Sequence, residues 1–91
     1  MFVVVAYDIS HNRRRTRLAK ILLDYGERVQ ESVFEAEVPP DLFAEMIARA
    51  QDVIDATEDT VRFYTLSRRS VREVRILGQG ELHRPEPVYV F

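Results

Sequence analysis

Hydrophobic positions along the chain fall into short runs and periodic patterns that predict alternating strands and helices. The run at 2–7 is continuous, β-branched and aromatic, which is typical of a strand covered on both faces. Polar residues 10–12 follow and supply a turn and the N-terminal cap of a helix. The apolar residues of this helix recur at helical spacing: Leu18, Ile21, Leu22 and Tyr25. Gly26 follows them and is expected to cap the C-terminus of the helix.

The middle of the chain predicts another strand region and a second helix. Segment 28–38 is strand-like because apolar residues alternate with glutamates in its second half. Its length barely suffices for two strands, so it forms either two short strands or one strand bent near 30–32. Two prolines and an aspartate at 39–41 begin a helix, whose apolar positions are Leu42, Phe43, Met46, Ile47, Ala50 and Ile54.

The last third predicts strands at 61–66, 71–77 and 87–91, with a break at Gly78-Gln79-Gly80. This order predicts the α+β class, specifically a ferredoxin-like βαββαβ sandwich of two helices on one antiparallel sheet, with an extra C-terminal strand. We assign the ferredoxin-like domain to 1–78 and a C-terminal extension to 79–91. An apolar strand at a terminus invites pairing with another sheet edge, so this strand is expected to be exchanged in a homodimer.

Composition restricts the class of protein. A chain of 91 residues is one domain. It contains no cysteine, which excludes disulfides, thiol nucleophiles and zinc knuckles and fits a cytoplasmic protein. The longest apolar run is too short to span a bilayer, and the first residues lack the basic region of a signal peptide. Multi-domain enzymes, membrane proteins and dinucleotide-binding folds of the usual length are therefore excluded.

Charge is unevenly distributed, although 13 basic and 15 acidic residues give a net charge of only −2. Segment 9–23 carries five basic residues and no acid, and 61–77 carries five arginines against one glutamate. Between them, 35–59 holds eight acids and one arginine. All the basic residues but Lys20 are arginines, whose planar fork grips phosphate with two hydrogen bonds. A single arginine is more often solvated or salt-bridged, but the cluster at 13–17 favours phosphate contact.

Asp8 is the main candidate for chemistry because it ends the first strand, where ligand sites commonly form. It either caps the following turn or binds a hard cation, and the basic helix beyond it favours the cation. A metal on Asp8, with arginines to hold phosphate, is the minimum for metal-assisted phosphodiester cleavage. One carboxylate is few for magnesium, and a two-fold dimer would supply a second Asp8.

Other candidates are weaker. His11 is available as a general base, but a turn histidine before a helix is usually solvated, and His83 lies in a polar stretch. The rings of Tyr7, Phe34 and Tyr64 suit stacking on bases, although strands of a small domain usually bury such rings. The absence of a phosphate-binding glycine loop argues against hydrolysis of nucleoside triphosphates.

Several segments together resemble one family: the Tyr7-Asp8-Ile9 strand end, the basic helix start at 13–18, the Tyr25-Gly26 pair, and segments 29–35 and 59–66. In this order, from 1 to about 77, the chain is similar to the CRISPR-associated protein 2 family. The resemblance implies a ferredoxin-like homodimer in which Asp8, as a divalent-metal ligand, faces its symmetry mate. Many relatives carry a further acid in the next loop, whereas this chain has Ser10-His11-Asn12 and depends on Asp8 alone.

The resemblance also implies a function and a set of site residues. It implies a magnesium-dependent endonuclease acting on RNA or double-stranded DNA, and a role in spacer acquisition with CRISPR-associated protein 1, the integrase. The alternative is a non-catalytic dimeric scaffold that bridges DNA and the integrase. In the expected site, Asp8 is the catalytic residue and metal ligand. The expected nucleic-acid contacts are Arg13, Arg14, Arg15 and Arg17. The expected supporting residues are Tyr7, Ser10, Gln30, Ser32 and Phe34.

Overall fold

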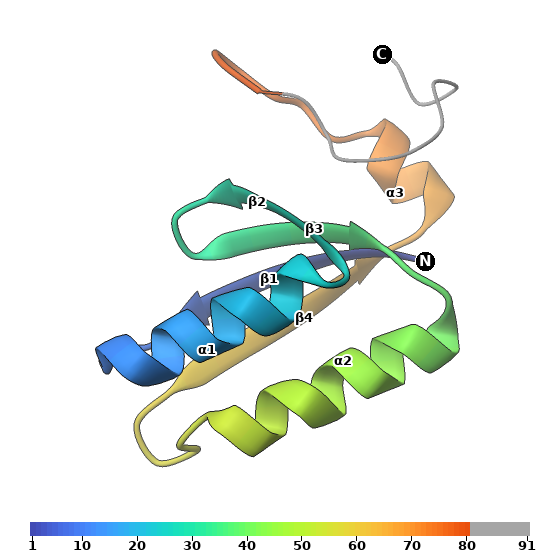
Figure 1. Ribbon diagram of the computed structural model, residues 1–91. Coiled ribbons are helices and arrows are strands. Elements are labelled where there is room, and N and C mark those ends of the chain that lie inside the picture. The colour runs from blue at the N-terminus through green and yellow to red at the C-terminus, as the bar shows by residue number, and fades with distance from the viewer. Residues whose placement is uncertain (81–91) are drawn as a thin grey trace.

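The structure, a computed structural model, describes residues 1–80 and contains a four-stranded antiparallel sheet with helices (Figure 1). The sheet order is β2-β3-β1-β4, and the α+β class is as predicted. The strand predicted at 87–91 lies outside the described residues, as does most of the extension predicted at 79–91. The elements in chain order are β1 (Phe2–Asp8), α1 (Asn12–Leu23), β2 (Gly26–Gln30), β3 (Val33–Glu37), α2 (Pro40–Val53), β4 (Thr60–Leu66) and α3 (Arg68–Arg72).

The core lies between one face of the sheet and helices α1 and α2. Alternate residues of β1 point to this side, and Val3, Val5 and Tyr7 are buried there. They pack in one cluster with apolar residues of the helices and β3, including Leu18, Leu22, Phe34, Ala36, Met46 and Ala50. The periodicity read from the sequence therefore identified the buried faces of both main helices, except that Leu42 of α2 is 39% exposed.

The opposite, open face of the sheet is only partly covered by the described residues. Val4 and Ala6 are half-buried there, whereas Phe2 is buried against Val71 of α3. Within residues 1–80, the prediction that the 2–7 run is covered on both faces is therefore right for Phe2 and only partly right for Val4 and Ala6. None of the helices within residues 1–80 has the length and apolar character needed to cross a membrane.

The turn after α1 differs from the prediction. The helix ends at Leu23, and Gly26 begins β2 instead of capping the helix with a positive φ. A Cβ atom at Gly26 would lie 2.0 Å from the carbonyl oxygen of Glu35. Glycine is needed here because β2 approaches β3 closely.

Segment 28–38 forms two strands, which resolves the two alternatives left by the sequence. The strand β2 begins two residues before that segment, so there is room for β2, a turn at 31–32 and β3. The β2–β3 register shifts between Arg28 and Gln30, which marks a β-bulge.

The strand predicted at 71–77 is wrong: residues 71 and 72 belong to the short helix α3, and residues 73–77 form neither helix nor strand. The Ser67 hydroxyl caps this helix by accepting a hydrogen bond from the backbone N–H of Ser70 at 3.1 Å. Val71 and Val74 are three residues apart, which suits a helical turn, whereas Val74 and Ile76 are two apart, which suits a strand. By contrast, the segments predicted as the second helix and as the 61–66 strand are present as α2 and β4.

Candidate aspartate site and nucleic-acid interface

Asp8 lies at the end of β1 on the open face of the sheet. It is exposed, and its Cα pairs with that of Thr60 on β4. Its carboxylate makes no hydrogen bond or ion pair with any described residue. With Arg62 and Tyr64 it lines a shallow hollow of about 360 Å³. Asp8 is therefore a free anionic oxygen donor and does not cap the turn.

Arg62 is the cation in the same hollow. Its guanidinium donates a hydrogen bond to the Tyr64 hydroxyl at 3.4 Å, and this bond raises the pKa of Arg62. The Tyr64 ring is 46% exposed, contrary to the expectation that strand aromatics are buried. A carboxylate, a guanidinium and an exposed phenol thus share one concave surface.

The donor set around Asp8 fits a hard cation only in part. Nowhere in residues 1–80 do three or more histidine or acidic side chains gather as a metal site. A carboxylate oxygen is a ligand that magnesium prefers, and magnesium commonly uses one or two carboxylates with water and phosphate oxygens. One chain therefore supplies one ligand, Asp8.

Arg14 is engaged inside the molecule. Its guanidinium donates to both carboxylate oxygens of Asp59, at 2.8 and 3.2 Å, and to Glu58 at 3.2 Å. The Asp59 side chain is fully buried and also accepts from the backbone N–H of Asp55 at 2.8 Å. These contacts, the Arg14 hydrogen bond above all, hold the pKa of Asp59 below its ordinary value. Phosphate contact by Arg14, which the sequence led us to expect, is disfavoured by this pairing.

Arg15 orders the loop that follows Asp8. Its guanidinium donates to the carbonyl oxygens of Ile9 at 2.9 Å and Ser10 at 3.2 Å, and to the Asn12 side chain. His11, in the same loop, caps α1 by accepting a hydrogen bond from the backbone N–H of Arg14. Arg15 and His11 therefore have structural partners next to the candidate site.

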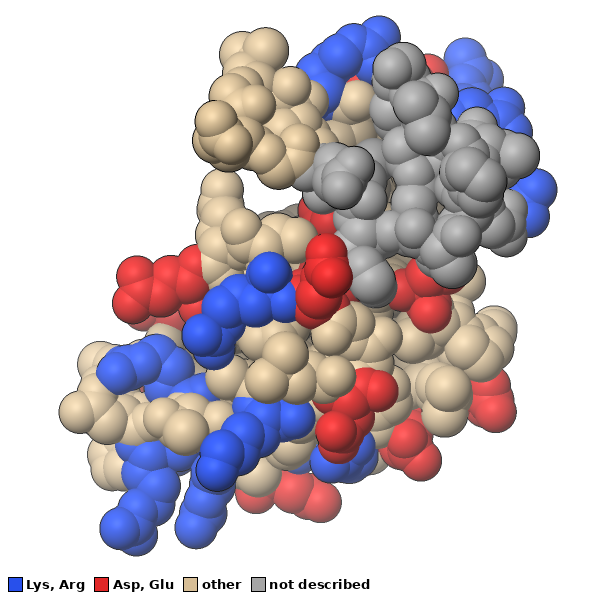
Figure 2. Space-filling view, turned by 45° about the horizontal axis from the view of Figure 1, so that its top comes forward, with Lys and Arg blue, Asp and Glu red and all other residues tan. Residues whose placement is uncertain are grey.

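Three cations of α1 remain free, and we call them the α1 stripe: Arg13, Arg17 and Lys20. They are exposed and form no ion pair with described residues. Positions four and three residues apart lie on one helix face, here the face opposite the buried Leu18 and Leu22. Figure 2 shows basic side chains gathered toward the α1 end of the molecule and again around α3, with acidic side chains between.

Ser10 lies in the loop directly after Asp8, whereas the other predicted supporting residues do not surround the Asp8 carboxylate. Tyr7 and Phe34 are buried on the helix side of the sheet, with ring centroids 6.2 Å apart. Gln30 ends β2, and Ser32 lies in the turn after it, where its carbonyl oxygen accepts from the Tyr7 backbone N–H. Tyr7 and Phe34 therefore belong to the core.

Sequence reasoning missed Thr60 and Arg62 as neighbours of Asp8. The alternation in 60–66 places both residues, with Tyr64, on one face of a strand. Only the β1–β4 register, in which Asp8 pairs with Thr60 and Ala6 with Arg62, brings this face to Asp8.

The fold and the site define a small α+β protein that presents a free strand-end carboxylate beside an arginine-rich helix. The family model described as CRISPR associated protein Cas2 matches residues 1–74. The chain belongs to this family, as the resemblance noted in the sequence implied.

Relatives and solved structures extend the match. The CRISPR-associated endoribonuclease Cas2 of Mycobacterium tuberculosis is 46% identical over the whole chain and 78% of its own length. The crystal structure of Streptococcus pyogenes Cas2 at pH 6.5 matches with a TM-score of 0.76 and 40% identity, over 86% of this chain and 100% of that one. A chain from a partial Cas6-RT-Cas1–Cas2 complex matches with a TM-score of 0.72 and 28% identity, over 84% and 89%.

Proposed function

We propose that this protein is a magnesium-dependent endonuclease that cleaves phosphodiester bonds of RNA or DNA in CRISPR adaptation. The observation that carries the proposal is the free, exposed carboxylate of Asp8 beside Arg62 in a concave surface. Family membership supports it, as does the endoribonuclease name of the Mycobacterium tuberculosis relative.

Each group around Asp8 has a distinct part in this proposal. Asp8 would hold Mg²⁺, which when bound supplies Lewis-acid stabilisation of charge on the phosphate oxygens. Arg62 offers hydrogen-bond donors to the same phosphate, because its guanidinium lines the hollow with Asp8. Arg15 holds the loop beyond Asp8 in place, and the α1 stripe binds the backbone of the strand at a distance from the cut.

A homodimer is part of the proposal because one chain offers a single acidic ligand. A two-fold axis that passes near Asp8 would place two such carboxylates at one cation. The open face of the sheet suits such an interface, since it presents half-buried Val4 and Ala6 and the exposed ring of Tyr64.

The test is a cleavage assay on matched RNA and DNA substrates, with magnesium and with a chelator. We expect Asp8→Asn to lose at least about a hundredfold in cleavage rate, because this change removes the anionic oxygen but keeps the size of the side chain. Asp52→Asn is the matched control, since Asp52 is an exposed aspartate of α2. Parent-level cleavage by Asp8→Asn, or cleavage that persists in the chelator, would overturn the proposal.

A second candidate function is a non-catalytic scaffold that bridges DNA and Cas1. The matched chain from a complex that contains Cas1 and Cas2 favours it, and so do the free cations of the α1 stripe. In this case Asp8→Asn leaves assembly with Cas1 and DNA unchanged, whereas loss of Arg13 and Arg17 weakens it. Size-exclusion chromatography of the mixture distinguishes the two results.

A further inference from the structure

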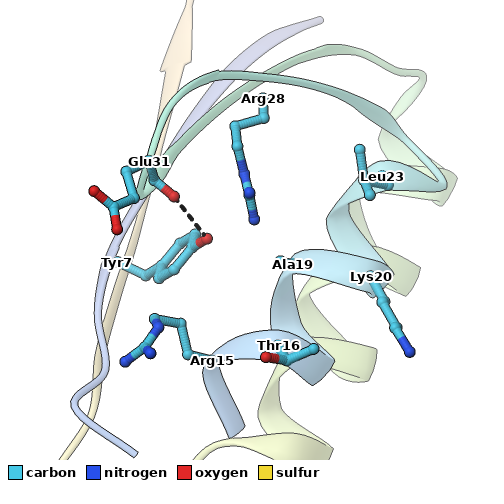
Figure 3. Close-up of a pocket in the computed structure, with 8 residues that line it drawn as sticks. All are labelled: Tyr7, Arg15, Thr16, Ala19, Lys20, Leu23, Arg28 and Glu31. Atoms are coloured by element: carbon cyan, nitrogen blue, oxygen red, sulfur yellow. Dashed lines mark hydrogen bonds between the residues drawn. The ribbon is translucent and has the colours of Figure 1, made fainter. Parts of the chain in front are cut away.

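A basic groove lies on the helix side of the sheet, between α1 and the β2–β3 hairpin (Figure 3). Its volume is about 320 Å³, and Tyr7 lies at its floor. Thr16 and Lys20 of α1 form one wall, and Arg28 of β2 extends from the other wall into the space. The groove is separate from the Asp8 hollow, because Tyr7 and Asp8 are consecutive strand residues and point to opposite faces.

The hairpin fixes the direction of Arg28. Arg28 pairs directly with Phe34 on β3, so both side chains point to the helix side of the sheet. The guanidinium carbon lies 5.3 Å from the centroid of the buried Phe34 ring, a cation–π contact. The bulge that follows Arg28, and the close strand approach that Gly26 permits, shape the hairpin at this point. The aromatic ring therefore holds the cation in place without neutralising it.

Among residues 1–80, the groove cations Arg28 and Lys20 have no counter-ion. Arg28 and Lys20 form no ion pair or hydrogen bond with described residues, and the Thr16 hydroxyl likewise has no described partner. Glu31 also lines the groove, but Figure 3 shows its carboxylate on the far side of the Tyr7 ring from Arg28. The Tyr7 hydroxyl donates to the Glu31 carbonyl oxygen at 3.3 Å, which closes the floor.

We propose that this groove binds one phosphate of a single-stranded nucleic acid, held between Arg28 and Lys20. The inference rests on the proposed nucleic-acid function and adds a second contact point, on the opposite face of the sheet from the Asp8 side chain. The guanidinium fork of Arg28 donates to two phosphate oxygens, and Lys20 and the Thr16 hydroxyl donate to oxygens of the same phosphate. Leu23, 56% exposed beside them, offers an apolar contact to the sugar.

The size of the groove limits what it can hold. Its volume lies at the lower end for ligand pockets, with room for a phosphate and its sugar. The bound phosphate is either a terminal monoester or an internal diester, and both use the same donors.

The experiment measures binding of short, 3′-labelled single strands by fluorescence anisotropy in a magnesium-free buffer. Each strand carries either a 5′-phosphate or a 5′-hydroxyl. We expect Arg28→Gln to weaken binding about tenfold or more, which corresponds to one lost charge-assisted pair. Lys20→Gln is expected to weaken it about threefold without altering the hairpin, but Lys20 also belongs to the α1 stripe, so Arg28→Gln is the variant that tests the groove. Arg68→Gln, an exposed arginine of α3, is the matched charge control and is expected to bind like the parent.

Comparison of the 5′-phosphorylated and 5′-hydroxyl oligonucleotides shows whether the bound phosphate is terminal or internal. A loss in Arg28→Gln confined to the 5′-phosphorylated strand assigns a terminal phosphate, and an equal loss on both assigns an internal one. Binding by Arg28→Gln equal to that of Arg68→Gln would overturn the groove, whatever the effect of Lys20→Gln. That result would not affect the proposal that cleavage depends on Asp8. Conversely, cleavage that does not depend on Asp8 would refute the nuclease proposal but would not affect the proposed phosphate groove.

Discussion

The α1 stripe predicts a defined change in the salt dependence of nucleic-acid binding. The perturbation is the double variant Arg13→Gln and Arg17→Gln, which removes two of three free cations from one helix face. Each neutralised phosphate contributes about 0.9 to the slope of log affinity against log salt for a duplex, and about 0.7 for a single strand. The double variant therefore lowers the slope by about 1.8 or about 1.4.

These slopes translate into measurable affinities. When salt rises fourfold, from about 50 to about 200 mM, the parent should lose about twelvefold more affinity than the double variant on a duplex. On a single strand the difference is about sevenfold. Titrations by anisotropy in a chelating buffer, at four or more salt concentrations, give both slopes.

The control for this prediction exchanges the internal pair, Arg14→Gln together with Asp59→Asn. It keeps the net charge and removes an arginine of the same cluster whose guanidinium already binds a buried carboxylate. We expect its slope to equal that of the parent. A parent-like slope for the Arg13 and Arg17 variant, or an equal drop in the control, would refute the division of the cluster into free and engaged arginines.

Two further predictions concern the framework of the site. Because Arg14 lowers the pKa of Asp59 in the folded state, this carboxylate stabilises the fold above its unfolded pKa of about 4, and the stabilisation is lost as pH falls through the lower folded value. The melting temperature of Asp59→Asn should therefore be lower than that of the parent at pH 7, and the difference should become smaller at acid pH. A difference in melting temperature that does not change with pH in thermal scans would contradict this. Gly26→Ala should destabilise the protein by about 1–3 kcal/mol, since its Cβ would meet the Glu35 carbonyl oxygen at 2.0 Å; an unchanged denaturant midpoint refutes it.

Much of the fold follows from local pattern. Buried positions of α1 and α2 recur at helical spacing, and β1 is a continuous apolar run, so each was predictable one segment at a time. The errors arose where local pattern is ambiguous. Segment 71–77 has spacings that suit both strand and helix, and the position of Gly26 depends on a neighbouring strand that the sequence does not display.

The site was less predictable than the fold because it depends on pairing across the sheet. Asp8 was identified from its place at the end of an apolar run, but its neighbour Arg62 lies 54 positions along the chain. Likewise, three adjacent arginines look alike in sequence. Only tertiary structure gives Arg14 a buried partner, turns Arg15 to the loop carbonyl oxygens and leaves Arg13 free.

The most direct test of the central claim, that two Asp8 carboxylates from two subunits act at one site, is a subunit-mixing experiment. Parent protein is exchanged with increasing fractions of Asp8→Asn at constant total concentration, and cleavage is measured. If both carboxylates are required, activity follows the square of the parent fraction, so that an equal mixture retains about a quarter of it. Activity that falls in simple proportion to the parent fraction would contradict the claim.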